Sequence, residues 1–213
     1  MKAGIIVFPG TNCDIDTKRA CEHFGWQAEY LWHDETCLDK YDVIFLPGGF
    51  SYGDYIRAGR LAKFSPAVMA LNDYIERKNG FVIGICNGFQ VLCERKLLPG
   101  ILSMNDSTKF ICDIVPLKVS IDSHPEDICL PVAHAEGRYI ASPETLKEIE
   151  DNGMVFLRYK DNPNGSVNDI AGLYDRDNRI IGLMPHPERA IFKETGLEDG
   201  KYFFKMFENA LNN

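Results

Sequence analysis

The sequence has no pair of cysteines at the CxxC spacing, no apolar run long enough to span a membrane and no cluster of basic residues. Its seven cysteines are irregularly spaced, which argues against a disulfide framework and against a zinc ribbon. The first apolar run stops at Pro9, too early for the hydrophobic core of a signal peptide. We therefore expect a cytoplasmic protein.

The charge balance is acidic, with 31 Asp and Glu against 23 Lys and Arg and a net charge of -8. The basic residues are scattered along the chain, so no surface is predicted to neutralise the phosphates of a nucleic acid. No stretch approaches the roughly 18 apolar residues of a membrane span. Neither a nucleic acid nor a membrane is expected as a partner.

Short apolar runs bounded by Pro and Gly occupy residues 3–8, 42–47 and 81–86. Such runs are typical of strands that are buried on both faces of a parallel sheet. Residues 14–25 and 65–80 between them have helix patterns, and the second of these places Ser65 as N-cap, Pro66 at the first helical position and Gly80 after the end. Strand and helix therefore alternate in the first half of the chain.

The second half predicts a hairpin over residues 170–185, turning at Asp175 to Asn178, and a final helix over 199–213. No repeat or linker divides the chain, so we expect one α/β domain over residues 1–213. Its central sheet should be mostly parallel, flanked by helices, with antiparallel additions in the C-terminal half. The active site of such a sheet usually lies outside the carboxyl ends of its strands.

Cys86 ends the third apolar run, within "GICNGFQ", and lies between Gly84 and Gly88. This is the spacing of a strand-turn-helix elbow, G-x-nucleophile-x-G, in which a strained turn exposes the nucleophile. The two glycines allow the strand and the helix to approach closely. A cysteine there lies at a helix N-terminus, which favours its thiolate. The alternative is a cysteine that merely ends a core strand, and the elbow makes the nucleophile the better interpretation.

A thiolate that attacks a carbonyl carbon needs a proton shuttle, and "GLMPHPER" offers His186 with Glu188 two residues later. Pro187 favours extended backbone at His186, which would place the Glu188 carboxylate behind the imidazole as its orienting partner. Taken alone, this segment is equally well read as a proline-stiffened loop. The main rival base is His134, which has Glu136 two residues on but lacks the proline.

The remaining cysteines and histidines have simpler interpretations. Cys21 and Cys93 lie within helix patterns and are predicted to be small core residues, whereas Cys13, Cys37, Cys112 and Cys129 lack an elbow or a nearby base. His23, His33 and His124 are expected at the surface. A glycine pair in "LPGGFSYGDY" follows a strand, where free N–H groups of the backbone could stabilise an oxyanion.

In order along the chain, "LPGG", "GICNGFQ" and "PHPE" resemble the three signatures of class I glutamine amidotransferases, whose fold is flavodoxin-like. The strings "FPGTNCD", "FSYGDYIRAGRLA", "AHAEGRY", "NPNGS" and "GLMPHPER" narrow the resemblance to the glutaminase subunits of phosphoribosylformylglycinamidine synthases. The resemblance runs from the first strand to Arg189. Ala135 stands where we expect a glycine in this family, and residues 111–128 and those after 191 match less clearly.

The resemblance implies roles for six residues. Cys86 would be the nucleophile and His186 the general base and acid, with Glu188 orienting it. The backbone N–H groups of Gly49 and Asn87 would form the oxyanion hole, and Gln90 would line the glutamine pocket.

The same resemblance implies the substrate and the partners. L-glutamine would be hydrolysed through a glutamyl thioester, and the ammonia would pass to a synthetase subunit that uses ATP and Mg²⁺ in purine biosynthesis. A small bridging subunit would complete the assembly. No metal and no cofactor are expected in this chain.

Two other functions remain open. One is a γ-glutamyl hydrolase or a cysteine peptidase of the same fold, which would use Cys86 and His186 on a peptide-like bond. The other is a catalytically silent regulatory subunit. The presence of Cys86, His186 and Glu188 together argues against the silent subunit, which would need none of them.

Overall fold

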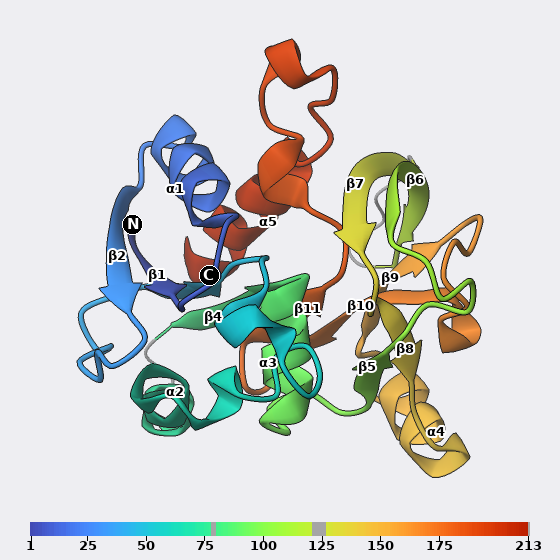
Figure 1. Cartoon of the computed structure of the whole chain (residues 1–213). Helices are drawn as coiled ribbons and strands as arrows, with labels where there is room; N and C mark the ends of the chain where they lie inside the picture. The colour runs from blue at the N-terminus through green and yellow to red at the C-terminus, as the bar shows by residue number, and fades with distance from the viewer. Residues whose placement is uncertain (78–79, 121–126, 213) are drawn as a thin grey trace.

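A nine-stranded sheet forms the centre of the computed structural model, which describes residues 1–77, 80–120 and 127–212 (Figure 1). In order across the sheet the strands are β2 (Gln27–Trp32), β1 (Lys2–Val7), β3 (Val43–Leu46), β4 (Phe81–Ile85), β11 (Ile180–Leu183), β10 (Ile170–Asp175), β9 (Val155–Tyr159), β6 (Ile111–Val119) and β7 (Ile128–His134). The strands from β2 to β11 pair in parallel, and those from β11 to β7 pair antiparallel. The predicted mostly parallel sheet with antiparallel additions is therefore confirmed.

The three apolar runs predicted as strands are β1, β3 and β4, and the predicted hairpin is β10 with β11. Both β3 and β4 are buried along their whole length. This explains why their sequences are continuously apolar, because each strand has a helix layer on both sides. The hairpin turns where it was expected, and the Asp175 carboxylate accepts hydrogen bonds from the backbone and side chain of Asn178.

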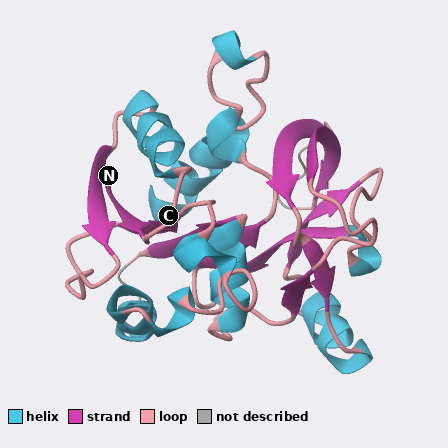
Figure 2. Cartoon of the chain, in the orientation of Figure 1, coloured by secondary structure: helices cyan, strands magenta, loops and turns pink. Residues whose placement is uncertain are grey.

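Helices cover both faces of the parallel part of the sheet (Figures 1 and 2). On one face lie α1 (Asp14–His23) and α5 (Lys201–Asn212), and on the other lie α2 (Pro66–Glu76) and α3 (Asn87–Glu94). The antiparallel part is accompanied by α4 (Pro143–Asp151) and by a small two-stranded sheet of β5 (Ile101–Ser103) and β8 (Arg138–Ile140). No helix in the described ranges is both long and apolar enough to cross a lipid bilayer.

The final helix α5 fills one face of the core with aromatic side chains. Phe203, Phe204 and Phe207 are fully buried, and the Phe204 ring stacks on Phe24 with centroids 5.2 Å apart. Burying each such ring contributes on the order of 1.5–3 kcal/mol relative to leaving it exposed. The Trp26 indole N–H also donates to a side chain of this helix, so α5 ties the last residues to the first half of the chain.

The predicted cap of α2 is only partly right. Ser65 holds the N-cap position with extended backbone and Pro66 begins the helix, but the Ser65 hydroxyl accepts no hydrogen bond from the helix and is buried without a partner. Ser142 shows the full arrangement at α4, because its hydroxyl oxygen accepts the Thr145 N–H at 3.2 Å. Residue type therefore predicted where α2 starts, while packing decided the side-chain orientation.

Candidate active site

Three neighbouring parallel strands bring the sequence signatures to one edge of the sheet. Leu46 of β3 lies opposite Gly84 of β4, and Ile85 of β4 lies opposite Leu183 of β11. The segments that follow these strands begin with the glycine pair, with Cys86 and with the residues leading to His186. Their meeting point is thus fixed by strand order and register, at the carboxyl edge where open α/β sheets bind ligands.

Cys86 lies in a strained turn between β4 and α3, with φ 51° and ψ -104°. A non-glycine residue in such a conformation costs on the order of 1–3 kcal/mol and usually marks a functional site. A Cβ on Gly84 would lie 2.7 Å from the Gly88 backbone, and one on Gly88 would lie 1.9 Å from the Leu46 carbonyl oxygen. The glycines therefore have the steric role that the motif predicted.

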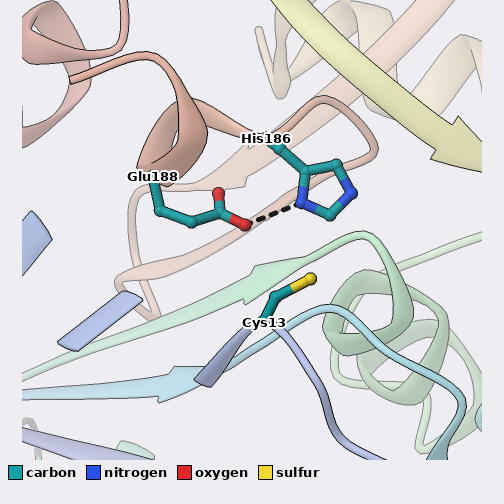
Figure 3. A group of neighbouring side chains, drawn as sticks. All are labelled: Cys13, His186 and Glu188. Carbon is teal, nitrogen blue, oxygen red and sulfur yellow. Dashed lines mark hydrogen bonds and ion pairs between the residues drawn. The ribbon is translucent and has the colours of Figure 1, made fainter. Parts of the chain in front are cut away.

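His186 and Glu188 form a buried pair in which the imidazole Nδ1–H donates to Glu188 Oε1 at 2.7 Å (Figure 3). Both residues are about 1% exposed. The contact does not arise from extended chain as expected, because Pro187–Arg189 forms a 3₁₀ turn that brings the carboxylate back to the ring. The proline favours this turn at its first position, where its missing N–H costs nothing.

The charges around His186 favour its protonated form. Burial lowers the pKa of the imidazole, but the negative charges of Glu188 and of a Cys86 thiolate, with hydrogen bonding to Cys13 and Cys86, raise that pKa well above its ordinary value. The Nε2 atom is buried and has no hydrogen-bond partner in the described part of the chain. A nitrogen in this state is ready to exchange a proton with a group in the adjoining pocket.

Cys13 is a second thiol beside His186 that the sequence did not single out. The ligand atoms of Cys13, His186 and Glu188 all lie within 4.8 Å of one another, and Figure 3 shows the sulfur on the side of the imidazole. Gly48 makes room for this cluster, because a Cβ there would lie 2.7 Å from the His186 ring and 3.2 Å from the Cys13 sulfur. The sequence feature that could have indicated this is the position of "FPGTNCD", which directly follows β1 and therefore lies at the same edge of the sheet.

Cys13, His186 and Glu188 are also a set that could hold a metal ion. The His186 nitrogen nearest Glu188 is, however, occupied by the hydrogen bond to that carboxylate. A metal bound through this nitrogen would have to replace the bond, whereas the intact pair is the arrangement that orients an imidazole for proton transfer.

Two small pockets meet at Cys86. One, of about 160 Å³, is lined by Asn12, Cys13, Gly49, Phe50, Cys86, Phe110, Ala133, His186 and Arg189. The other, of about 50 Å³, is lined by Gly49, Phe50, Asp54, Ala58, Cys86, Gln90, Ala133, His134, Ala135 and Glu136. Because the two share four lining residues, the Cys86 side chain lies where they join.

Gly49 has φ 149°, and a Cβ on it would lie 2.8 Å from both the Thr11 Cα and the Asn12 nitrogen. Glycine adopts this conformation readily because it has no Cβ, whereas other residues rarely do. Within the described residues no acceptor is recorded for the Gly49 N–H. The Asn87 N–H is in the first turn of α3, where backbone donors have no partner within the helix. The two predicted oxyanion donors therefore flank Cys86 with their N–H groups available.

Gln90 lines the smaller pocket, and its place in a glutamine pocket, which the resemblance implies, stays a prediction. Both ends of its amide are engaged: Oε1 accepts from Asn87 Nδ2 at 2.9 Å, and Nε2 donates to the Glu136 carbonyl at 2.6 Å. Gln90 thus joins Asn87 to the backbone of Glu136 in the wall of this pocket. Ala135 fits the neighbouring turn because its backbone φ is not in the positive region that would require glycine.

His134, the rival base, also lines the smaller pocket, but its partner differs from the sequence-based expectation. Asn105 Oδ1 accepts from its Nδ1 at 3.1 Å, whereas Glu136 accepts from the Ala58 backbone N–H at 3.2 Å. Burial, followed by the charge of His186, lowers the pKa of His134 to about 4. His134 is therefore a neutral imidazole at physiological pH, without a carboxylate to stabilise a proton on it.

The remaining candidates lie away from this site or contribute to the core. Cys21 and Cys93 are buried, and burial raises the pKa of both thiols, that of Cys21 to about 12, so they are poor nucleophiles. His23 is exposed as expected, but His33 is half-buried and bonded to the Tyr52 hydroxyl. His124 lies outside the described residues.

Comparisons with known proteins agree with the geometry. Residues 1–212 match the family model described as a CobB/CobQ-like glutamine amidotransferase domain. A curated protein of Prochlorococcus marinus named phosphoribosylformylglycinamidine synthase subunit PurQ is 45% identical and covers the whole of both chains. A protein of the same name from Nostoc is 48% identical over 99% of this chain and 97% of its own. A chain in a structure described as PurLQS from Thermotoga maritima is 41% identical, with a TM-score of 0.90 over 99% of this chain and 98% of its own.

Proposed function

This chain belongs to the PurQ family of phosphoribosylformylglycinamidine synthase subunits, and we propose that it hydrolyses L-glutamine to supply that synthase with ammonia. The observation that carries the mechanism is the strained elbow at Cys86, which joins the pocket containing the hydrogen-bonded His186–Glu188 pair. A nucleophile, a base and an orienting carboxylate are the three parts that a thiol amidase needs.

In the first half of the reaction, the Cys86 thiolate attacks the side-chain carboxamide carbon of glutamine. The negative charge that develops on the carbonyl oxygen is stabilised by the N–H groups of Gly49 and Asn87. The C–N bond then breaks, His186 gives its proton to the departing nitrogen, and ammonia leaves while a glutamyl thioester remains on Cys86. The raised pKa of His186 suits it to arrive at this step protonated.

In the second half, His186 takes a proton from water, which attacks the thioester carbon; the C–S bond breaks, glutamate leaves with its new carboxyl group losing a proton to solvent, and the Cys86 thiolate and protonated His186 are restored. Glu188 stabilises the imidazolium and fixes the ring so that Nε2 faces the reacting atoms. This sequence uses only groups of this chain, glutamine and water. We therefore assign ATP and Mg²⁺ to the synthetase subunit.

We further propose that the chain assembles with the synthetase subunit and a small bridging subunit, as the PurLQS relative suggests. Apolar side chains exposed beside the pockets support a docking surface: Phe50 is 49% exposed, Tyr55 73% and Ile56 84%. Exposed apolar groups gathered near a functional site are typical of a binding surface. The free state of all seven cysteines fits assembly in a reducing cytoplasm.

The test compares glutamine-dependent and ammonium-dependent synthesis in the assembled complex. Cys86→Ala should abolish synthesis with glutamine and leave synthesis with added ammonium intact, and Cys37→Ala, at an exposed thiol, serves as control. Synthesis from glutamine that survives Cys86→Ala would refute the mechanism. Glutamine hydrolysis that never supports synthesis in the wild-type complex would favour a γ-glutamyl hydrolase instead.

A further inference from the structure

Two carboxylates face the smaller pocket beside Cys86 without a cation from the protein. Asp54 and Glu136 both line this pocket, and neither forms an ion pair with a basic side chain of the described residues. They lie close enough that burial, followed by the charge of Glu136, raises the pKa of Asp54 to about 6. Two like charges in a partly buried site are costly unless a cation joins them.

The position of Asp54 is built into the fold. Asp54 has φ 51° and follows Tyr52 and Gly53, which also have positive φ. The Asn87 amide donates to Asp54 Oδ1 at 3.2 Å, and the same amide donates to Gln90. Strain of this kind persists only where the surrounding structure holds it, and it clusters at ligand-binding sites.

Two hydrogen bonds fix the position of Glu136. Its Oε2 accepts the Ala58 N–H at 3.2 Å, and its carbonyl oxygen accepts from Gln90 Nε2. Its Oε1 has no recorded donor in the described part of the chain. A hydrogen-bond network therefore runs from the Asp54 carboxylate through the side chains of Asn87 and Gln90 to the backbone carbonyl of Glu136, and the Ala58 N–H fixes the Glu136 carboxylate itself.

A third residue that lines this pocket, His134, also has an acceptor atom without a hydrogen-bond donor. His134 lines it, is only 3% exposed, and its Nε2 atom is buried with no partner. The Asn105 amide donates through Nδ2 to the carbonyls of Lys109 and His134, so its Oδ1 must accept from His134 Nδ1. His134 Nε2 is consequently an unprotonated acceptor without a partner, on a residue that lines the pocket together with the two acidic residues.

We propose that Asp54 and Glu136 bind the α-ammonium group of L-glutamine and thereby restrict the substrate to the free amino acid. This inference rests on the proposed glutaminase function and adds the specificity of its site. An α-ammonium carries one positive charge and three N–H donors, which matches two carboxylates and a further acceptor. It is the one cationic group of glutamine, whose carboxamide must lie at Cys86. The pair therefore recognises the end of the substrate that does not react.

The experiment uses the assembled complex and two substrates, L-glutamine and glutaramate, the analogue that lacks the α-amino group. Wild type should strongly prefer glutamine. Glu136→Gln and Asp54→Asn should each raise KM for glutamine by about 10- to 150-fold, the range for hydrogen bonds to charged groups, with kcat changed little. The preference for glutamine over glutaramate should fall by a similar factor in each variant. Glu76→Gln, an exposed carboxylate on α2, is the matched control.

Ammonium-dependent synthesis reports whether each variant is folded and assembled, and it should equal that of wild type. An unchanged KM for glutamine in both variants would overturn the inference. So would a raised KM with an unchanged preference over glutaramate, because the carboxylates would then act only on the structure. Failure of the glutaminase mechanism would appear instead as Cys86→Ala activity with glutamine, so the two proposals can fail separately.

Discussion

The hydrogen bond between His186 and Glu188 predicts a large and specific effect for Glu188→Gln. Both side chains are nearly inaccessible to solvent, and the carboxylate is 2.7 Å from the imidazole nitrogen. Glutamine has almost the same shape but no charge, so the substitution removes the stabilisation of the imidazolium without opening a cavity. The change therefore isolates the electrostatic role of Glu188.

The magnitude depends on how the new amide is oriented. If its oxygen faces His186 Nδ1, the ring keeps its tautomer and loses a charged hydrogen bond of about 1.5–3 kcal/mol, or roughly 10- to 150-fold in kcat. If its nitrogen faces the ring, Nδ1 must accept and Nε2 carries the proton at the wrong step. The loss then approaches the roughly 10⁴-fold known for the same change in a serine protease triad.

The assay is glutamine-dependent synthesis by the assembled complex across a range of pH, with ammonium-dependent synthesis as the internal control. Since Glu188 raises the pKa of His186, Glu188→Gln should also shift the controlling pKa of the pH profile to a lower value. The orienting role of Glu188 would be refuted by a variant with wild-type kcat and an unmoved pH profile. A parallel loss of the ammonium-dependent reaction would show that the substitution acts on folding or assembly instead.

Two further predictions concern the elbow and its surroundings. Gly88→Ala should destabilise the chain by about 1–3 kcal/mol or more in urea and reduce glutamine-dependent activity more than tenfold, because the new Cβ would lie 1.9 Å from the Leu46 carbonyl oxygen. Gly153→Ala, whose Cβ would meet open space, should lose some stability because its φ is 61° but keep its activity. Wild-type activity in Gly88→Ala would contradict the packing argument. Glu94, buried beneath three basic side chains of residues 57–63, has a lowered pKa, so its stabilisation is present above about pH 4.5 and is lost as pH falls through the folded pKa. Glu94→Gln should therefore lower the urea midpoint at pH 7, and its effect should shrink progressively as pH falls below about 4.5. A loss that stays constant over this range would exclude the charge effect.

The parts of the structure that depend on local patterns were predictable from sequence. Continuous apolar runs gave β1, β3 and β4, and the spacing of Gly84 and Gly88 around Cys86 gave the elbow, because the steric needs of a tight turn fall on nearby residues. The turn between β10 and β11 was also local, with Asp175 bonding Asn178 three residues later.

The parts that depend on contacts between distant segments were not predictable from one sequence. Cys13 lies within 4.8 Å of His186, far along the chain, only because β1, β3, β4 and β11 line up at one edge. The Asp54 and Glu136 carboxylates meet for the same reason, since β7 and the segment after β3 reach the pocket from different parts of the fold. His134 was paired with the wrong partner because residues two apart share a side in extended chain, whereas Asn105 comes from another loop.

The proposed mechanism depends on Cys86, rather than the neighbouring thiol of Cys13, being the nucleophile. The most direct measurement treats the assembled complex with an electrophilic glutamine analogue that carries a diazoketone in place of the carboxamide, and then locates the adduct by peptide mass spectrometry. We expect one adduct, on Cys86, that persists in Cys13→Ser and disappears in Cys86→Ser. An adduct on Cys13 in the wild-type complex, or labelling that survives Cys86→Ser, would contradict it.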